Sequence, residues 1–259
     1  MSDKTPALPV VVARIGVSAK PVVNTTVMDK AFAALQTYDR GSSRATLMPI
    51  DDVVVASLDD ALLRRELERR LAAVLRTKVS PVAKEYVCSK LGLIGSAESV
   101  PALAEFLADR NLAHVVQSAL ESMPCPEAAQ AIRDGLPRLG GLEKVGAINC
   151  LAVRRDAQSV SVLATLLADS DNLVRLAALA ALGNIGTKEA AQSLQGFRPN
   201  AADSIHLAVA DALLACAERL LSAGKKTESL AIYKSLTDSR QPKHIRLAAN
   251  RGLMTAQKL

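Results

Sequence analysis

The sequence predicts an all-α fold, specifically a right-handed α-solenoid of stacked helical hairpins. The first observation is a period of about 31 residues, and the second is that each period contains two helices separated by a turn. Large apolar residues keep this spacing at the end of the first helix (Leu120, Leu151, Leu182 and Leu213) and in the second helix (Ile132, Leu163 and Leu194). A fourth copy fits at Leu91 and Leu103, 29 residues before the next. Because one hairpin cannot bury both faces of its helices, neighbouring hairpins must stack into a continuous core.

The turns repeat as well. Residues in one register can accept a hydrogen bond from a free amide at the start of the second helix, namely Ser96, Asp156 and Thr187. Cys125 holds this register in another unit, and Pro126 follows it at the favoured first helical position. Gly95 and Gly186 precede two of these caps, where a helix can end in a left-handed residue that glycine adopts without strain.

The run VRLAALAALGNIGTKEAAQSL resembles a HEAT repeat of the short bacterial type, also called PBS-lyase HEAT-like. The resemblance is clear over 82–197 and weaker over 203–213 and 241–253. The run LLSAGKKTESLAIYKSL resembles half of a tetratricopeptide unit. The resemblance implies an ARM/HEAT-like superhelix, most often an interaction scaffold and less often an enzyme or a subunit of one.

The chain is expected to divide into four parts. Prolines at positions 6, 9 and 21 and an apolar run broken by Arg14 indicate a flexible arm at the start of the chain. Helix pairs are expected at about 82–107, 112–136, 143–167 and 173–197, and Pro199 ends this series. The predicted parts are an N-terminal arm (1–26), capping helices (27–80), four HEAT-like repeats (81–198) and divergent HEAT/tetratricopeptide-like helices (199–259).

Helices are also expected on both sides of the repeats. Before them the sequence predicts helices over 27–38, from Asp51 or Asp52 to Ser57, and over 61–77. The last of these has one apolar face, and its opposite face, expected to meet solvent, carries Arg64, Arg65, Glu66, Glu68, Arg69 and Arg70. After the repeats, helices are expected over about 203–222, 228–236 and 243–257.

Composition narrows the possible functions. Aromatic residues make up 2% of the chain, with no Trp, so stacking sites for nucleic-acid bases are few. The formal net charge of +6 comes from residues 225–259, which hold eight basic and two acidic residues. Such a segment is either a solvated helical tail or a surface that attracts an acidic partner. Four cysteines without close pairing indicate free thiols, three of them in helix cores, and therefore a reducing cytoplasm.

A column of basic residues stands seven positions before each first-helix marker. It comprises Lys84, Lys144, Arg175, His206 and, less regularly, Arg246, with Ala113 as an interruption. One interpretation is a ladder that faces phosphates or the carboxylates of a partner. The other is that these groups hold loop aspartates such as Asp169 or Asp171. The candidate partner-binding residues are therefore Lys84, Lys144, Arg175, His206, Lys243, His244 and Arg246.

No motif indicates catalysis, a cofactor or a metal. His114, His206 and His244 are far apart and none is followed by Glu, and the glycine-containing stretch 135–141 lacks the Lys-Ser/Thr of a phosphate-binding loop. The expected function is a non-catalytic, cytoplasmic scaffold that binds another protein, with no cofactor and no membrane segment. Two alternatives stay open: nucleic-acid binding through the basic C-terminal segment, and a role as accessory subunit of a lyase-type enzyme.

Overall fold

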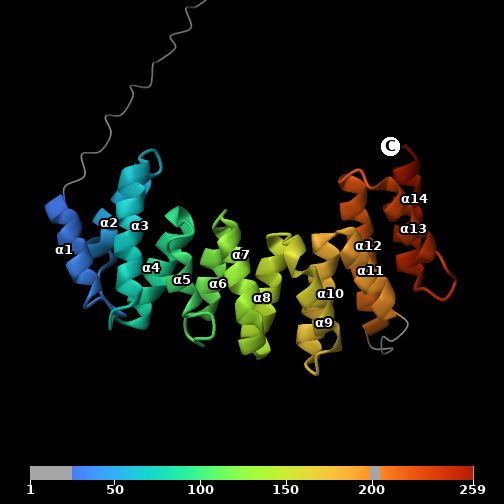
Figure 1. Cartoon of the computed structure of the whole chain (residues 1–259), viewed down its shortest axis with the longest axis horizontal. Helices are drawn as coiled ribbons and strands as arrows, with labels where there is room; N and C mark the ends of the chain where they lie inside the picture. Colours follow the sequence, from blue (N-terminus) through green and yellow to red (C-terminus); the bar gives the residue numbers. More distant parts are fainter. Residues whose placement is uncertain (1–24, 199–204, 259) are drawn as a thin grey trace, which may run out of the picture.

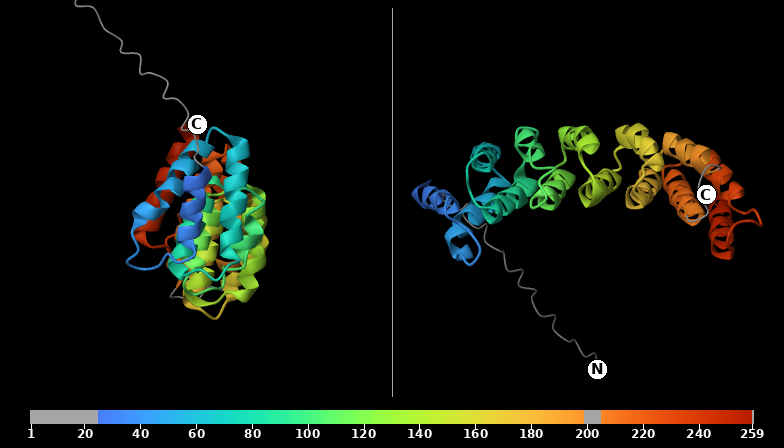
Figure 2. Two further views of the ribbon diagram at one scale, coloured as in Figure 1. Left: turned by 90° about the vertical axis from the view of Figure 1, so that its left-hand side faces the viewer. Right: turned by 90° about the horizontal axis from the view of Figure 1, so that it is seen from below.

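The computed structural model describes residues 25–198 and 205–258. Across these residues the secondary structure is entirely helical, and the helices form a curved rod that runs from α1 at one end to α14 at the other (Figures 1 and 2). The right-hand view of Figure 2 shows the rod as an arc. The predicted all-α solenoid is confirmed. The predicted flexible arm lies outside the described residues, except that Thr25 and Thr26 form the first turn of α1.

Three α-helices and a short 3-10 helix precede the first hairpin. They are α1 (Thr25–Leu35), η1 (Arg44–Leu47), α2 (Met48–Ser57) and α3 (Ala61–Leu75). Both α2 and α3 pack against the first helix of the repeats, α4 (Pro81–Ile94). Their expected role as a cap stays a prediction.

Helical hairpins then follow in order. They are α4 with α5 (Val100–Ala104), α6 (Ala113–Ser122) with α7 (Pro126–Gly135), α8 (Gly141–Val153) with α9 (Val160–Thr165), α10 (Asn172–Ile185) with α11 (Lys188–Phe197), and α12 (His206–Ser222) with α13 (Lys226–Ser235). The last helix is α14 (Lys243–Lys258), which packs on both α12 and α13. Short 3-10 turns complete the connections: η2 (Leu136–Arg138), η3 (Ala157–Ser159) and η4 (Leu166–Ala168). No helix in the described part of the chain is both long and apolar enough to cross a membrane.

The predicted period appears directly in the core. The first helices α4, α6, α8, α10 and α12 pack one against the next along the rod. The apolar residues that mark their ends are all fully buried: Leu91, Leu120, Leu151, Leu182 and Leu213. Each unit therefore buries the same helical position against its neighbours, as the solenoid requires.

The turn between α10 and α11 follows the sequence-based prediction. Gly186 ends α10 in the left-handed region, with φ of 65°. Thr187 then caps α11, because its hydroxyl accepts a hydrogen bond of 3.1 Å from the amide of Ala190. Pro126 likewise begins α7 as expected.

Two other predicted turn features are wrong. Gly95 is extended, with φ of −66°, so it is not the left-handed residue expected there. Glycine suits the position for another reason, because a Cβ would overlap the carbonyl oxygen of Leu91. The carboxylate of Asp156 makes no cap hydrogen bond with the start of η3 and instead pairs with the guanidinium of Arg133 from the preceding hairpin. An aspartate can pair with a cation as readily as it can cap a helix. The fold places the guanidinium of Arg133 within reach of Asp156.

Glu68 is a further correction, because it was expected on a solvent-exposed face. Only 3% of its surface is exposed. Its Oε1 accepts hydrogen bonds from the amide and hydroxyl of Ser96, at 2.6 and 3.0 Å, and from the amide of Ser99 at 3.2 Å. The hydroxyl of Ser96 accepts a hydrogen bond of 3.2 Å from the amide of Glu98, as expected, and Glu68 of α3 adds a second acceptor to this turn. The helix α5 starts only at Val100.

All four cysteines are free thiols, as expected, and they differ in burial. Burial raises the pKa of Cys88, Cys150 and Cys216 to about 12, whereas Cys125 is partly exposed. We expect an aromatic disulfide reagent at pH 8 to modify Cys125 in the folded protein, because the reactive species is the thiolate. The other three thiols should react only after denaturant is added. Titration of released chromophore measures this, and fast reaction of more than one thiol in buffer would contradict the packing.

Candidate binding surface

Three members of the predicted basic column, Lys84, Lys144 and Arg175, contact other residues of the chain. The ammonium of Lys144 lies 3.3 Å from Oδ2 of Asp169 in the next hairpin, and both side chains are largely buried. The amide of Asp171, 2.9 Å away, and then Lys144 hold the pKa of Asp169 below its usual value. Arg175 donates to the carbonyl of Asp169 at 3.2 Å and to Oδ1 of Asn172 at 3.1 Å.

Lys84 belongs to the same column but makes a different contact. Its ammonium lies 4.3 Å from the centre of the Phe106 ring, a cation–π arrangement with the turn that follows α5. Lys144 and Arg175 thus hold the loop residue Asp169, which is the alternative that the sequence left open, whereas Lys84 packs on a ring and not on a loop aspartate. A role of these three residues in partner binding stays a prediction.

Two arginines that the sequence did not single out also hold neighbouring hairpins together. Arg133 of α7 pairs with Asp156 and donates to Oε1 of Gln158 at 2.8 Å. Arg154, after α8, donates to carbonyls around the end of α6, including that of Leu120 at 2.8 Å. Neither arginine repeats at the 31-residue spacing, so the periodicity contained no signal for it.

The first helices expose a surface that is largely apolar. We call it the first-helix face and define it by Leu142, Val145, Asn149 and Val153 of α8, Leu173, Leu176, Ala180 and Asn184 of α10, and Leu207, Asp211 and Ala215 of α12. Leu142, Leu173 and Leu207 are 73%, 54% and 44% exposed. On each helix these residues form one stripe at spacings of three or four, which is the stripe that the neighbouring helices leave uncovered.

The first-helix face keeps the register of the repeats. Leu142 and Leu173 stand 31 residues apart, and so do Val145, Leu176 and Leu207. Val145, Leu176 and Leu207 each directly follow a member of the basic column, so the 31-residue period also relates these three apolar residues to one another. Sequence reasoning missed them because a leucine at a helical position is assigned to the core by default.

The charge of the first-helix face contrasts with that of the second helices. Asp211 is the single charged residue among the residues that define the face. The exposed positions of α7 and α11, by contrast, include Glu127, Asp134, Lys188 and Glu189. Between α10 and α12 the face is hollowed into a groove of about 360 Å³, lined by alanines, by Leu176 and by Asp211.

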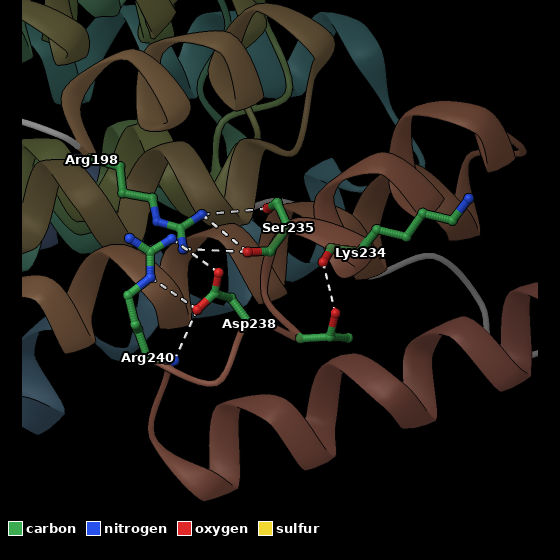
Figure 3. Close-up of polar contacts among 6 residues, drawn as sticks. Arg198, Lys234, Ser235, Asp238 and Arg240 are labelled. Carbon is green, nitrogen blue, oxygen red and sulfur yellow. Dashed lines mark hydrogen bonds and ion pairs between the residues drawn. The ribbon is translucent and has the colours of Figure 1, made fainter.

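A second hollow, of about 720 Å³, lies at the start of α12, and we call it the C-terminal hollow. The end of α11, the end of α13 and the loop before α14 also line it. Figure 3 shows Arg198, Ser235, Asp238 and Arg240 converging there, while the side chain of Lys234 points away. His206 and Leu207 line the hollow too, so it adjoins the first-helix face at Leu207.

Arg240 and Asp238 form a two-pronged ion pair in the C-terminal hollow. Nε of Arg240 lies 3.0 Å from Oδ1, its second guanidinium nitrogen lies 3.0 Å from Oδ2, and its amide donates to Oδ1 at 2.9 Å. These hydrogen bonds hold the pKa of Asp238 far below its usual range, so this carboxyl stays ionised. Arg198 donates instead to the carbonyl and hydroxyl of Ser235, at 3.3 to 3.4 Å.

The remaining predicted partner-binding residues lie at the same end of the rod. His206 is exposed and lines the C-terminal hollow. Lys243 and His244 are exposed in the first turn of α14, directly after the lining residue Pro242, and Arg246 is half-buried one turn later. The structure thus places four of the seven predicted residues near one hollow and ties the other three into the repeats. Within the described residues, no three His, Cys, Asp or Glu side chains are grouped so that they could hold a metal ion.

Comparisons with known proteins support the architecture. The family model described as HEAT repeats matches residues 143–215. A search among curated protein sequences finds no match. Similar solved structures include human deoxyhypusine hydroxylase in complex with glycerol, at 17% identity, 91% coverage of this chain, 98% of that chain and a TM-score of 0.38.

Two further structures show the same level of likeness. The complex of CpcE and CpcF of phycocyanin lyase from Nostoc sp. PCC7120 is 16% identical, with 97% of this chain and 100% of that chain covered and a TM-score of 0.40. An engineered protein is 18% identical, with coverages of 91% and 97% and a TM-score of 0.30. These likenesses are too loose to support any functional argument. HEAT repeats are thus matched over residues 143–215, and helical hairpins of the same kind continue on both sides of this segment.

Proposed function

We propose that this HEAT-repeat scaffold is non-catalytic and binds another protein through its first-helix face. The single observation that carries the proposal is the row of exposed apolar side chains in register on α8, α10 and α12. Solvent-exposed apolar patches of this kind, bordered by polar residues, are typical of interaction sites. Burying one such leucine contributes about 1.5–3 kcal/mol, so a few of them suffice for a stable complex.

The geometry of the face favours a helical segment as the bound element. Packed helices lie about 8–10 Å apart, so Val145, Leu176 and Leu207 form a row with roughly that spacing. Seven residues of a helix advance about 10.5 Å along its axis. A partner helix can therefore lie along the row. If it carries an apolar residue at every seventh position, these residues contact Val145, Leu176 and Leu207 in turn, which is the helix-in-groove mode of recognition.

Nucleic acid is a poorer match for this face. Phosphate contacts need lysines or arginines, whereas the charged residue on the first-helix face is Asp211. Bases also bind by stacking on aromatic side chains, and the chain has three Tyr, three Phe and no Trp.

The test is Leu173→Asp compared with Leu62→Asp. Leu173 is the second residue of α10, and Leu62, which is 83% exposed, is the second residue of α3. An acidic residue in the first turn of a helix is compatible with the helix dipole, so both variants should keep the wild-type helical melting curve. Each tagged protein is used to capture partners from extracts of the cells that make it, and the affinity of the recovered protein is then measured by titration calorimetry.

We expect Leu173→Asp to weaken binding of the recovered partner at least tenfold, because it removes an apolar contact and buries a carboxylate. Leu62→Asp should bind like the wild type. Equal binding by Leu173→Asp and wild type would refute the face as the binding site. Recovery of the chain's own second copy as the face-dependent species would change the proposed partner to a homodimer.

A further inference from the structure

We propose that the C-terminal hollow receives an acidic segment of a protein partner, so that aspartate or glutamate carboxylates pair with Arg198. This inference deepens the proposed function. It rests on that function in one respect, namely that the acidic segment belongs to the protein bound by the first-helix face. The juxtaposition that carries it is a hollow whose described lining holds two guanidinium groups and one carboxylate, and which opens beside the apolar first-helix face at Leu207.

Among the described residues that line the hollow, two arginines stand with one aspartate. Asp238 is fully engaged by Arg240, which contacts both of its carboxylate oxygens. Among the described residues, the acceptors of Arg198 are the carbonyl and hydroxyl of Ser235, which are neutral and lie at 3.3 to 3.4 Å. A guanidinium pairs more strongly with a carboxylate than with neutral oxygens, and it does so through two parallel hydrogen bonds. Arg198 therefore offers a planar donor edge that an incoming carboxylate can use.

The surroundings of the hollow extend this positive charge. Lys243 and His244 are exposed just beyond the rim, and Arg246 follows on the next turn of α14. The segment 225–259 carries eight basic and two acidic residues, while the rest of the chain is balanced. A local positive field of this kind guides an acidic partner to the C-terminal end of the rod.

The same features favour an acidic protein segment over a nucleic acid. Bases of a single-stranded nucleic acid bind by stacking on aromatic rings, and the described lining of the hollow holds no Phe, Tyr or Trp. Leu207 links the hollow to the largely apolar first-helix face, which suits a polypeptide that has apolar side chains followed by acidic ones. A partner helix on the face would then place its acidic end in the hollow, which fixes the direction in which it lies.

The experiment uses a fluorescein-labelled octaglutamate as probe, with fluorescence anisotropy of the full chain at low salt. We expect Arg198→Gln to weaken binding about tenfold, because one charge-assisted contact is lost. Asp238→Asn should strengthen binding severalfold, since it removes the repelling carboxylate. Lys226→Gln, an exposed residue of the same basic segment, makes the same charge change and should stay within twofold of wild type. Each variant is first checked for an unchanged melting curve.

Three results would overturn the inference. They are the absence of octaglutamate binding to the wild type, equal losses for Arg198→Gln and Lys226→Gln, and tighter Arg198-dependent binding of an octathymidylate probe. Because Asp238→Asn is expected to act in the opposite direction, a fold defect in Arg198→Gln cannot imitate the full pattern.

Leu173→Asp separates this inference from the proposed function. It should bind octaglutamate within twofold of wild type, although it loses the protein captured through the first-helix face. If no protein depends on the first-helix face while the octaglutamate pattern holds, the proposed function fails and the hollow remains a site for acidic segments. If the captured partner depends on Leu173 but not on Arg198, the hollow inference fails and the function stands.

Discussion

Replacing Gly183 by valine is expected to lower the free energy of unfolding by about 3 kcal/mol, at the upper end of what overpacking costs. Gly183 lies in α10 where that helix contacts α12, and a Cβ at this position would stand 2.7 Å from the carbonyl oxygen of Ala212 and 3.0 Å from its Cα. Both are backbone atoms, so α12 itself must move to make room. Chemical denaturation followed by circular dichroism measures the loss.

Gly196→Ala is the matched control for this prediction. Gly196 lies in α11, and a Cβ there would meet open space. Alanine should therefore stabilise the helix by about 0.5–1 kcal/mol, because it restricts the unfolded chain. A melting curve for Gly183→Val that matches the wild type would show that α10 and α12 do not approach as closely as described. Because repeats couple mainly to their neighbours, Gly183→Val should loosen the C-terminal hairpins first.

Replacing Arg154 by methionine is expected to cost about 3 kcal/mol of unfolding free energy, because hydrogen bonds from a charged group are worth more than neutral ones. The guanidinium of Arg154 holds the turn between α6 and α7. It donates hydrogen bonds to four backbone carbonyls, those of Leu120, Glu121, Met123 and Cys125. Methionine keeps the apolar stem of the side chain but donates nothing. In this partly buried turn, the four carbonyls then lose the hydrogen bonds that Arg154 donates.

Two controls define the cause of this loss. Arg155→Met changes the neighbouring, exposed arginine and should alter the free energy of unfolding by no more than about 0.5 kcal/mol. Arg154→Lys keeps the charge but lacks the planar fork, so it should recover only a small part of the stability. If Arg154→Lys were as stable as the wild type, the positive charge rather than the fork of hydrogen bonds would be the stabilising feature.

The sequence by itself determined the repeated architecture, because that information is local. The repeat spacing of 29 to 31 residues correctly predicted that Leu91, Leu120, Leu151, Leu182 and Leu213 are buried. The pair Gly186 and Thr187 correctly predicted one helix end and the next helix start. Helical periodicity, a positive φ that suits glycine, and a hydroxyl that caps a helix all depend on residues a few positions apart. Of the candidate partner-binding residues, His206 lines the C-terminal hollow and Lys243, His244 and Arg246 follow it in α14, while their role in binding stays a prediction.

Only the tertiary structure decided which side chains meet across hairpins. Asp156 pairs with Arg133, 23 residues away, and Glu68 binds Ser96, 28 residues away, so neither performs the role that its local sequence suggests. The exposure of Leu173 and the convergence of Arg198 on Ser235 likewise depend on how successive hairpins rotate against one another. A leucine is buried or left open according to whether a neighbouring helix covers it. That geometry arises from the packing of whole hairpins, and no short stretch of residues contains it.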